Sequence, residues 1–393
     1  MDFAFSPEDE AFRAEVRAFL KENIPPNWYG GFYGGNEEAG ALIKQLKQKA
    51  AAKGWLTMAW PKEYGGSDAP ISRQLVFAEE TTYHRAGLRD IGVGFLGPAI
   101  MRHGTEEQKK RFLGPMSRAE ITFHQGFSEP DAGSDLAGIT TRAIRDGDDF
   151  VISGQKIWGG ELDKAQYSFL LARSDPDAPK HKGISFLIIP ADTPGITYEK
   201  FGNLGGGNQM IVYYDNCRVP ASECLIGEEN QGWYIATTVL NHERGYVEHA
   251  ATSMRLLDEL VELWHAQGRE KRHDARTRIL RNRLAQIAVE IEVCRMMAYR
   301  IGWMQDAGMN PSSEASVIKI FGSELTQRFA HVAGDVLGLY AQIDGGTPKK
   351  DYVSLIGRVE HGIRGQIMWT IAGGTSEIQR NVIATRGLGL PRG

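Results

Sequence analysis

The sequence predicts an α+β protein in which a helical domain is followed by a small antiparallel β domain and then by a helical bundle. Apolar residues recur at helical spacing near the start of the chain, short β-branched or aromatic runs fill its middle, and long helical patterns return after residue 233. The length of 393 residues suggests two or three domains. We place them at residues 1–122, 123–232 and 233–393.

The helical prediction for the first domain rests on its helix starts. Residues 6–9, Ser-Pro-Glu-Asp, combine an N-cap, a proline in the first turn and acidic groups that face the helix dipole. Helical patterns also cover 40–53 and 72–87, and Thr105 with Gln108 forms a capping box. These segments predict a domain built from several helices.

The middle and last domains differ in the period of their apolar residues. The predicted strands are runs between clusters of Gly, Pro, Asp and Asn, and they lie at 150–158, 167–172, 184–189 and 210–214. Within 280–301, apolar residues recur in alternating steps of four and three, which is typical of the seam of a helical bundle. These helix faces are too extensive for one chain to cover, so we expect an oligomer.

Composition and charge exclude several classes of protein. The formal charge of −4 and the pI near 6.2 supply no global attraction for nucleic acid or an anionic membrane. The three cysteines have no CxxC spacing, so we expect reduced core thiols and no metal site. The N-terminus lacks the pattern of a signal peptide, and no apolar stretch of about 18 residues occurs. We therefore expect a cytoplasmic protein that neither inserts into a membrane nor binds nucleic acid.

Three conspicuous motifs have ordinary structural explanations. Residues 92–97 match the G-x-G-x-x-G pattern of dinucleotide sites, but their flanks are not strand-like, so we interpret them as a connection between helices. The three glycines at 205–207 are interpreted as a flexible hairpin. The basic cluster within 269–283 lacks interleaved aromatic residues, which favours a solvated turn over a nucleic-acid site. Contact with a phosphate of CoA or of a flavin is the second interpretation of that cluster.

A polar loop at the start of the β domain is a candidate binding segment. Residues 127–135 concentrate turn formers, hydroxyls and small residues, so they can present N–H groups and Ser hydroxyls to an oxygen-rich ligand. Gly133 lets such a ligand approach the chain closely. Trp158 could cover an aromatic ring system, although a lone Trp is more often part of the core.

Four segments resemble signature stretches of the acyl-CoA dehydrogenase family: 127–135, 154–158, 216–220 and 373–380. They occur in the family's order, and the resemblance covers essentially the whole chain. It implies FAD as cofactor and an active site where the β domain meets the C-terminal helices. It also implies an enzyme that takes a proton from Cα and a hydride from Cβ of a CoA thioester, leaving the trans-2-enoyl-CoA.

The resemblance assigns roles to individual residues. Contacts to FAD and the thioester head fall on Gln125, Phe127, Ser128, Gly133, Ser134, Trp158, Gly160, Thr375 and Glu377. Contacts to the substrate fall on Ser134, Asn241 and Arg244. FAD suits this reaction because its N5 accepts a hydride, and no metal is required.

The catalytic base is assigned by the same resemblance. The commonest position for a base in the family, immediately before the Gly-Thr-Ser stretch, is Gly373 here. A second group of members places a glutamate early in the first helix of the C-terminal domain, and Glu243 matches that position. A Glu beside an Arg is usually half of an ion pair. Within the resemblance, Glu243 is favoured as the base, and burial would raise its pKa.

Some departures from the family pattern leave alternatives open. Gly160 stands where members usually carry Thr or Ser, and 269–283 lacks the Phe of the segment that reaches a neighbour's flavin. Residues 342–346 match the Gly-rich cofactor loop only in part. The leading hypothesis is a dehydrogenase that passes electrons to an electron-transfer flavoprotein. The others are a non-catalytic or half-site partner subunit of a heteromeric acyl-CoA dehydrogenase, and an acyl-CoA oxidase-type flavoenzyme.

The resemblance also bears on assembly and substrate. We expect a homo-oligomer, as a dimer or tetramer, or a heterotetramer in which a sister subunit completes the flavin sites. The position of Glu243 favours a branched or cyclic acyl chain, as in fatty acid or steroid side-chain degradation.

Overall fold

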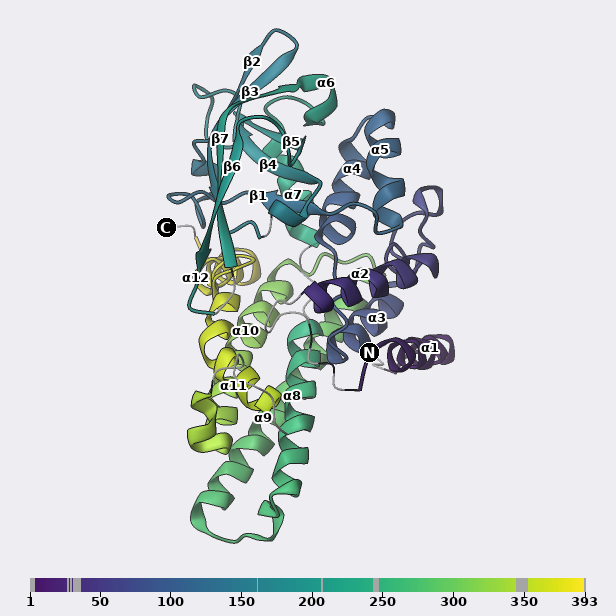
Figure 1. Ribbon diagram of the computed structural model, residues 1–393, viewed down its shortest axis with the longest axis vertical. Coiled ribbons are helices and arrows are strands. Elements are labelled where there is room, and N and C mark those ends of the chain that lie inside the picture. The colour runs from purple at the N-terminus through teal and green to yellow at the C-terminus, as the bar shows by residue number, and fades with distance from the viewer. Residues whose placement is uncertain are drawn as a thin grey trace.

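Figure 1 shows the computed structural model of the protein, with the sheet at the top, the long C-terminal helices at the bottom and the N-terminal helices along one side. The structure describes residues 4–26, 28, 30, 37–160, 162–205, 208–242, 247–343 and 353–391. Along the chain, helices give way to strands and then to helices again, which confirms the predicted fold class. Among the described residues, no helix has the length and apolar character needed to cross a membrane.

The N-terminal helices begin at the predicted caps. They are α1 (Pro7–Asn23), α2 (Glu37–Ala52), α3 (Ile71–Tyr83), α4 (Gly97–His103) and α5 (Glu106–Ser117). The Ser6 hydroxyl accepts a hydrogen bond from the N–H of Asp9 at 3.1 Å, and Thr105 and Gln108 cap α5 reciprocally. The glycine motif is itself helical, because 92–96 forms a π-helical turn that runs directly into α4. The expected connection is therefore part of a helix, and it does not form a dinucleotide loop.

The middle of the chain forms one sheet. Its strands are β1 (Phe123–Gly126), β2 (Arg142–Asp146), β3 (Asp149–Ile157), β4 (Tyr167–Arg173), β5 (Ile184–Pro190), β6 (Ile196–Gly202), β7 (Asn208–Pro220) and β8 (Leu225–Ile226), with α6 (Ala221–Cys224) before the last. They lie in the order β6-β7-β3-β2-β4-β5-β8, and β1 pairs with β4. Most neighbours are antiparallel as predicted, but β4 pairs in parallel with β1 and β2. The predicted runs correspond to β3, β4, β5 and β7.

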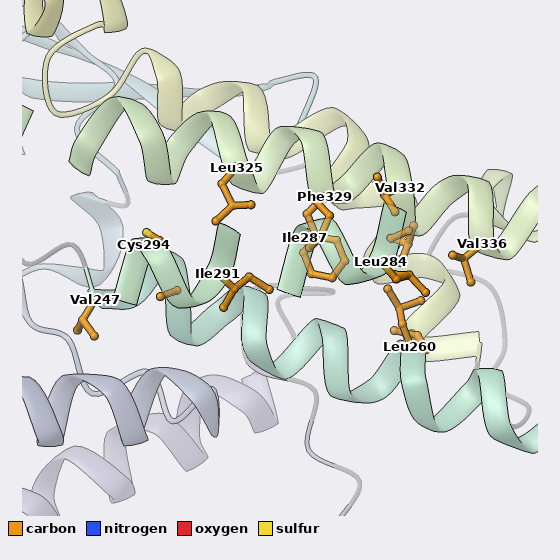
Figure 2. Close-up of a cluster of buried hydrophobic side chains, with 14 of the residues drawn as sticks. Val247, Leu260, Leu284, Ile287, Ile291, Cys294, Leu325, Phe329, Val332 and Val336 are labelled. Atoms are coloured by element: carbon orange, nitrogen blue, oxygen red, sulfur yellow. The ribbon is translucent and has the colours of Figure 1, made fainter. Parts of the chain in front are cut away.

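The C-terminal helices form a bundle around the predicted seam. They are α7 (Gly232–His242), α8 (Val247–Ala266), α9 (Ala275–Asp306), α10 (Ser312–Leu337), α11 (Val353–Gly365) and α12 (Ser376–Val382). On α9, Leu284, Ile287 and Ile291 are buried, and Figure 2 shows them beside Leu325 and Phe329 of α10. Since α8 and α10 of the same chain cover this seam, the seam does not require an oligomer, contrary to the sequence-based reason.

The three regions share core packing. One cluster of buried side chains joins Phe112 of α5, Phe169 of β4 and Val239 of α7. The type of secondary structure changes between α5 and β1 and again between β8 and α7. We propose domain boundaries near residues 122 and 232, where the type of secondary structure changes. The three regions nevertheless pack against one another across these boundaries.

A buried ion cluster joins the N-terminal helices to the bundle. The Glu79 carboxylate on α3 lies 2.6 Å from both Nη1 of Arg13 on α1 and Nε of Arg295 on α9. The Tyr299 hydroxyl donates to the same carboxylate at 2.8 Å. Only 5% of the Glu79 side chain is exposed, so this cluster is a desolvated network between helices.

Candidate functional site

The polar loop after β1 is held in a defined shape by its own backbone. The N–H groups of Glu129 and Ala132 each donate to the other residue's carbonyl oxygen, at 3.0 and 3.1 Å. The carbonyl oxygen of Ser128 accepts from an N–H of β3 at 2.9 Å, which ties the loop to that strand. Gly133 and Ser134 are exposed. A Cβ built on Gly133 would meet nothing within 4 Å, so the fold leaves open space above this part of the loop.

A buried ion pair lies between this loop and β3. Nζ of Lys156 is 2.7 Å from Oε1 of Glu129 and donates a second hydrogen bond to the carbonyl oxygen of Phe127 at 3.1 Å. The same carboxylate accepts from the N–H and hydroxyl of Thr140, at 2.7 and 2.9 Å, and from the N–H of Thr141, at 3.0 Å. Only 1% of the Lys156 side chain and 4% of the Glu129 side chain are exposed.

The electrostatics of this pair are those of two charges removed from water. Burial lowers the pKa of Lys156 to about 8, although the Glu129 carboxylate opposes that shift. Burial by itself would raise the pKa of Glu129, but the Lys156 ammonium and the hydrogen bonds from the two threonines hold it below its usual value. The charged form of the pair is thus supported by partners on both sides.

Trp158 follows β3 directly and turns its ring outward. Its φ is 70°, a left-handed conformation that is uncommon for a residue with a side chain. Although the indole contacts Phe201 of β6, with ring centroids 5.1 Å apart, 56% of Trp158 is exposed. This exposure is incompatible with an ordinary core role, and it leaves part of the indole accessible at the strand end that is bonded to the polar loop.

The two positions after Trp158 are occupied by glycine for different structural reasons. A Cβ on Gly159 would lie 2.1 Å from the carbonyl oxygen of Gln125 and 2.4 Å from Nε2 of His124, so the chain here packs closely on β1. Gly160 has a φ of 90° and open space around it. A β-branched residue is strained at such a φ, which is a physical reason for the absence of Thr at this position.

Two predicted contacts near β1 are oriented differently. Gln125 is half-buried and lies in register with Phe169 of β4. Phe127 is buried, and its ring packs against Phe169 and Phe186 in the core. Phe127 can therefore offer a ligand its backbone but not its ring.

Thr375 and Glu377 form a separate group at the start of α12. Thr375 is the N-cap, and its hydroxyl accepts from a backbone N–H of α12 at 3.2 Å. Glu377 is exposed in the first turn. The buried ammonium of Lys319 on α10 donates to the carbonyl oxygen of Gly374 at 2.6 Å, which fixes the Gly-rich approach to α12.

The predicted base, Glu243, and Arg244 lie outside the described residues, and Asn241 belongs to the last turn of α7. The first turn of α8 carries a second carboxylate, Glu248. Burial raises the pKa of Glu248, and its Oε2 is buried with no hydrogen-bond partner among the described residues. Burial also lowers the pKa of the adjacent His249 to about 4.

Sequence patterns did not single out the buried polar residues of this region. His124 is 2% exposed, its Nδ1 lies 2.9 Å from the Ser168 hydroxyl, and burial lowers its pKa to about 4. A signal for Lys156 did exist, because the two-residue period of β3 places it on the inward face with Phe150 and Ile152. Its partner could not be read from that pattern, since it lies 27 residues earlier on a loop.

Three consecutive regions of the chain match the domains of one family. Residues 6–120 match the N-terminal domain of the acyl-CoA dehydrogenases, 125–216 the middle domain and 230–388 the C-terminal domain. The chain belongs to the acyl-CoA dehydrogenase family. It is 34% identical to acyl-CoA dehydrogenase FadE26 of Mycobacterium tuberculosis, over 100% of this chain and 99% of that protein. Like its relatives, it is an oxidoreductase of this family.

Solved acyl-CoA dehydrogenase structures share the fold over its whole length. One, titled "Tcur3481-Tcur3483 steroid ACAD", has a TM-score of 0.90 and 35% identity, with all of both chains covered. A second is the ChsE4-ChsE5 complex from Mycobacterium tuberculosis, with a TM-score of 0.87, 33% identity and all of both chains covered. Heteromeric complexes thus occur among the structural neighbours of this acyl-CoA dehydrogenase.

Acyl-CoA dehydrogenases are flavoproteins whose usual cofactor is FAD. Three features of this chain fit such a group: the exposed indole of Trp158, the exposed Ser134 and the open space over Gly133. Flat aromatic surfaces and free donors are what an isoalloxazine ring and its oxygens require. Within the described ranges, no group of three or more His, Cys, Asp or Glu side chains could hold a metal ion.

Proposed function

We propose that this acyl-CoA dehydrogenase converts an acyl-CoA thioester to the trans-2-enoyl-CoA with FAD as its cofactor. The observation that carries the proposal is the exposed ring of Trp158 at the end of β3, a strand end that the Ile157 N–H bonds to Ser128 of the loop 127–135. FAD, when bound, supplies the hydride acceptor that protein side chains lack. The chain's own residues would hold the cofactor and thioester and remove the α proton.

The proposed roles follow the chemistry of each group. The loop 127–135, through Ser128, Gly133 and Ser134, would bind oxygen atoms of the flavin and the thioester head. Glu243 would take the proton from Cα, since a carboxylate beside apolar groups gains basicity. Glu248, five positions further on, illustrates that effect, because burial raises its pKa. Asn241 and Arg244 are proposed as substrate contacts, and Thr375 and Glu377 as contacts to the rest of FAD.

The proposed substrate class is a CoA thioester with a steroid-type, branched or cyclic acyl chain. Support comes from two solved structures titled as a steroid ACAD and its variant, which are 35% and 36% identical to this chain. We propose an electron-transfer flavoprotein as the electron acceptor. An oxidase would instead be reoxidised by oxygen at a comparable rate, and stopped-flow reoxidation of the reduced protein separates the two.

We also propose that α9 contacts a second acyl-CoA dehydrogenase chain through an outer stripe made of Val289, Val293, Met296 and Met297. Val289 and Val293 are 59% and 40% exposed. Each follows a residue of the buried seam by two positions, about 200° around the helix, so it points away from α8 and α10. The stripe lines a groove of about 620 Å³. The complexes among the structural neighbours support a sister subunit as the partner.

The test of the proposed reaction is an anaerobic titration of the FAD-loaded protein with acyl-CoA thioesters of linear, branched and steroid-type chains. Bleaching of the flavin absorbance identifies both the activity and the acyl class. Glu243→Gln should bind the thioester but slow bleaching by about 10²-fold or more. Glu248→Gln is the matched control, because it removes a nearby buried carboxylate. If Glu248→Gln abolishes bleaching and Glu243→Gln does not, the base has been assigned to the wrong residue.

A half-site partner subunit is the second candidate. The glycines at 160 and 373, where family members carry functional groups, favour it, as do the two-chain complexes. Protein expressed alone decides between the two candidates. One FAD per chain, bleached by a thioester, excludes the half-site role, whereas FAD binding that appears only after a sister chain is added supports it.

A further inference from the structure

The ion pair of Lys156 and Glu129 connects the loop 127–135 to the strand that ends at Trp158. Through the Phe127 carbonyl oxygen it holds the start of the loop, at 3.1 Å. Through Thr140 and Thr141 it holds the short segment between the loop and β2, at 2.7–3.0 Å. Lys156 itself lies on β3, two residues before Trp158. Together, the Lys156 ammonium and the Glu129 carboxylate therefore fix the start of the loop and the segment that follows it against the strand that presents the indole.

Neighbouring hydrogen bonds make this connection rigid. The Thr141 hydroxyl donates to the carbonyl oxygen of Gln155, at 3.0 Å, and the N–H of Ile157 donates to the carbonyl oxygen of Ser128, at 2.9 Å. These bonds flank Lys156 on both sides along β3. A shift of the carboxylate would consequently move the loop and the strand end together.

Stability alone is a weak reason to keep such a pair in a protein core. Desolvation of two charges costs about as much as their attraction returns, so apolar replacements of buried pairs are often neutral or stabilising. Directional bonds to four separate backbone or hydroxyl groups do something that an apolar contact cannot, because each bond fixes an orientation. The ion pair therefore acts mainly by orienting the segments to which it is hydrogen-bonded, and not by stabilising the fold.

We propose that Glu129 and Lys156 are positioning residues that hold the loop 127–135 and the Trp158 strand end in the arrangement that binds FAD. The proposal rests on FAD being the cofactor of the proposed function. Neither side chain contacts the ligand in this assignment, because both are almost completely buried.

Glu129→Gln is the informative change, since it keeps the shape of the side chain and removes its charge. Glu79→Gln is the matched control: that carboxylate is also buried and ion-paired, at 2.6 Å to Arg13, but it lies among helices. The double variant Glu129→Gln with Lys156→Met removes both charges, so it folds without an unpaired buried ion.

Two measurements test the proposal. Amide hydrogen exchange of the FAD-free protein should speed up at Thr140 and Thr141 by about tenfold or more in Glu129→Gln, because their N–H groups lose a charged acceptor. The dissociation constant of FAD, from flavin fluorescence, should rise about tenfold in Glu129→Gln and in the double variant. Glu79→Gln should change neither quantity once both are corrected for the folded fraction.

Parent-like FAD affinity and exchange in Glu129→Gln, together with a loss of stability equal to that of Glu79→Gln, would overturn the proposal. A parent protein that binds FAD but is bleached by no thioester would contradict the proposed reaction, while the FAD measurements still decide the role of the pair. A parent protein that binds no FAD would overturn both the cofactor assignment and the link from the pair to FAD.

Discussion

The planes of the Trp158 indole and the Phe201 ring meet at 77°, so β6 contacts the indole on one side and does not enclose it. Trp158→Ala should lower the retention of FAD, because a covered aromatic side chain buries about 150–250 Å². The free energy of unfolding of the FAD-free protein should change by less than about 1 kcal/mol, since the ring is exposed. The flavin-to-protein ratio after gel filtration measures the first effect.

The control for this change is Tyr198→Ala. Tyr198 is 44% exposed on the same strand as Phe201, but the two-residue period of a strand turns it to the other face. It should retain FAD like the parent. Equal FAD loss in both variants would mean that the indole makes no specific contact with the flavin.

Gly160→Thr should destabilise the fold and not improve the flavin site. The φ of 90° at this position is strained for a β-branched residue, so we expect a loss of about 1–3 kcal/mol in the free energy of unfolding. Gly133→Ala is the control, because its Cβ would meet open space at an ordinary φ. Urea unfolding of the FAD-free variants measures both values. Parent-like stability in Gly160→Thr would show that the chain relaxes there without cost.

Acid should weaken the fold between pH 6.5 and about 4. Burial lowers the pKa of His124 and of His249 to about 4, so in this window the unfolded chain binds protons that the native chain does not. The free energy of unfolding should fall as pH falls, by up to about 3 kcal/mol for each histidine. His124→Asn should reduce that slope. A slope that is identical in the parent and in His124→Asn excludes His124 as a contributor.

The outer stripe of α9 should control assembly. Val289→Asp with Val293→Asp should lower the mass measured by light scattering, because charges oppose burial of this face. Ile144→Asp, a change at a position on β2 that is 40% exposed, serves as control and should leave the mass unchanged. An unaltered oligomer in the α9 variant would place the interface elsewhere, and a monomeric parent protein would exclude the assembly itself.

Sequence patterns predicted the helices and strands whose signals lie within a few neighbouring residues. The N-cap at Ser6 and the buried strand at 167–172 needed no partner to be recognised. By contrast, β2 and β6 carry mostly exposed residues, so they lack the apolar runs that identified the other strands. The parallel pairing of Phe123 with Tyr167 joins residues far apart in sequence, and no local pattern encodes it.

The features of the candidate site likewise fall into those that local sequence patterns identified and those that depend on tertiary packing. The loop 127–135 could be found because it concentrates turn formers, hydroxyls and small residues, and Trp158 because it ends a predicted strand within a segment that resembles the family. The exposure of Trp158, the left-handed φ of Gly160 and the ion pair between the loop and β3 could not, because each depends on tertiary packing. The inward place of Phe127 was likewise decided by its aromatic neighbours on β4 and β5.

Because α9 has two apolar faces, substitutions that affect folding and substitutions that affect the proposed pairing of subunits fall at different positions. Substitutions along the inner seam would disturb the chain's own folding, whereas substitutions at the exposed Val289 and Val293 would act on the proposed interface. At the proposed interface, a repulsive substitution at Val289 or Val293 would discriminate between partner chains without altering the packing that α9 makes within its own chain.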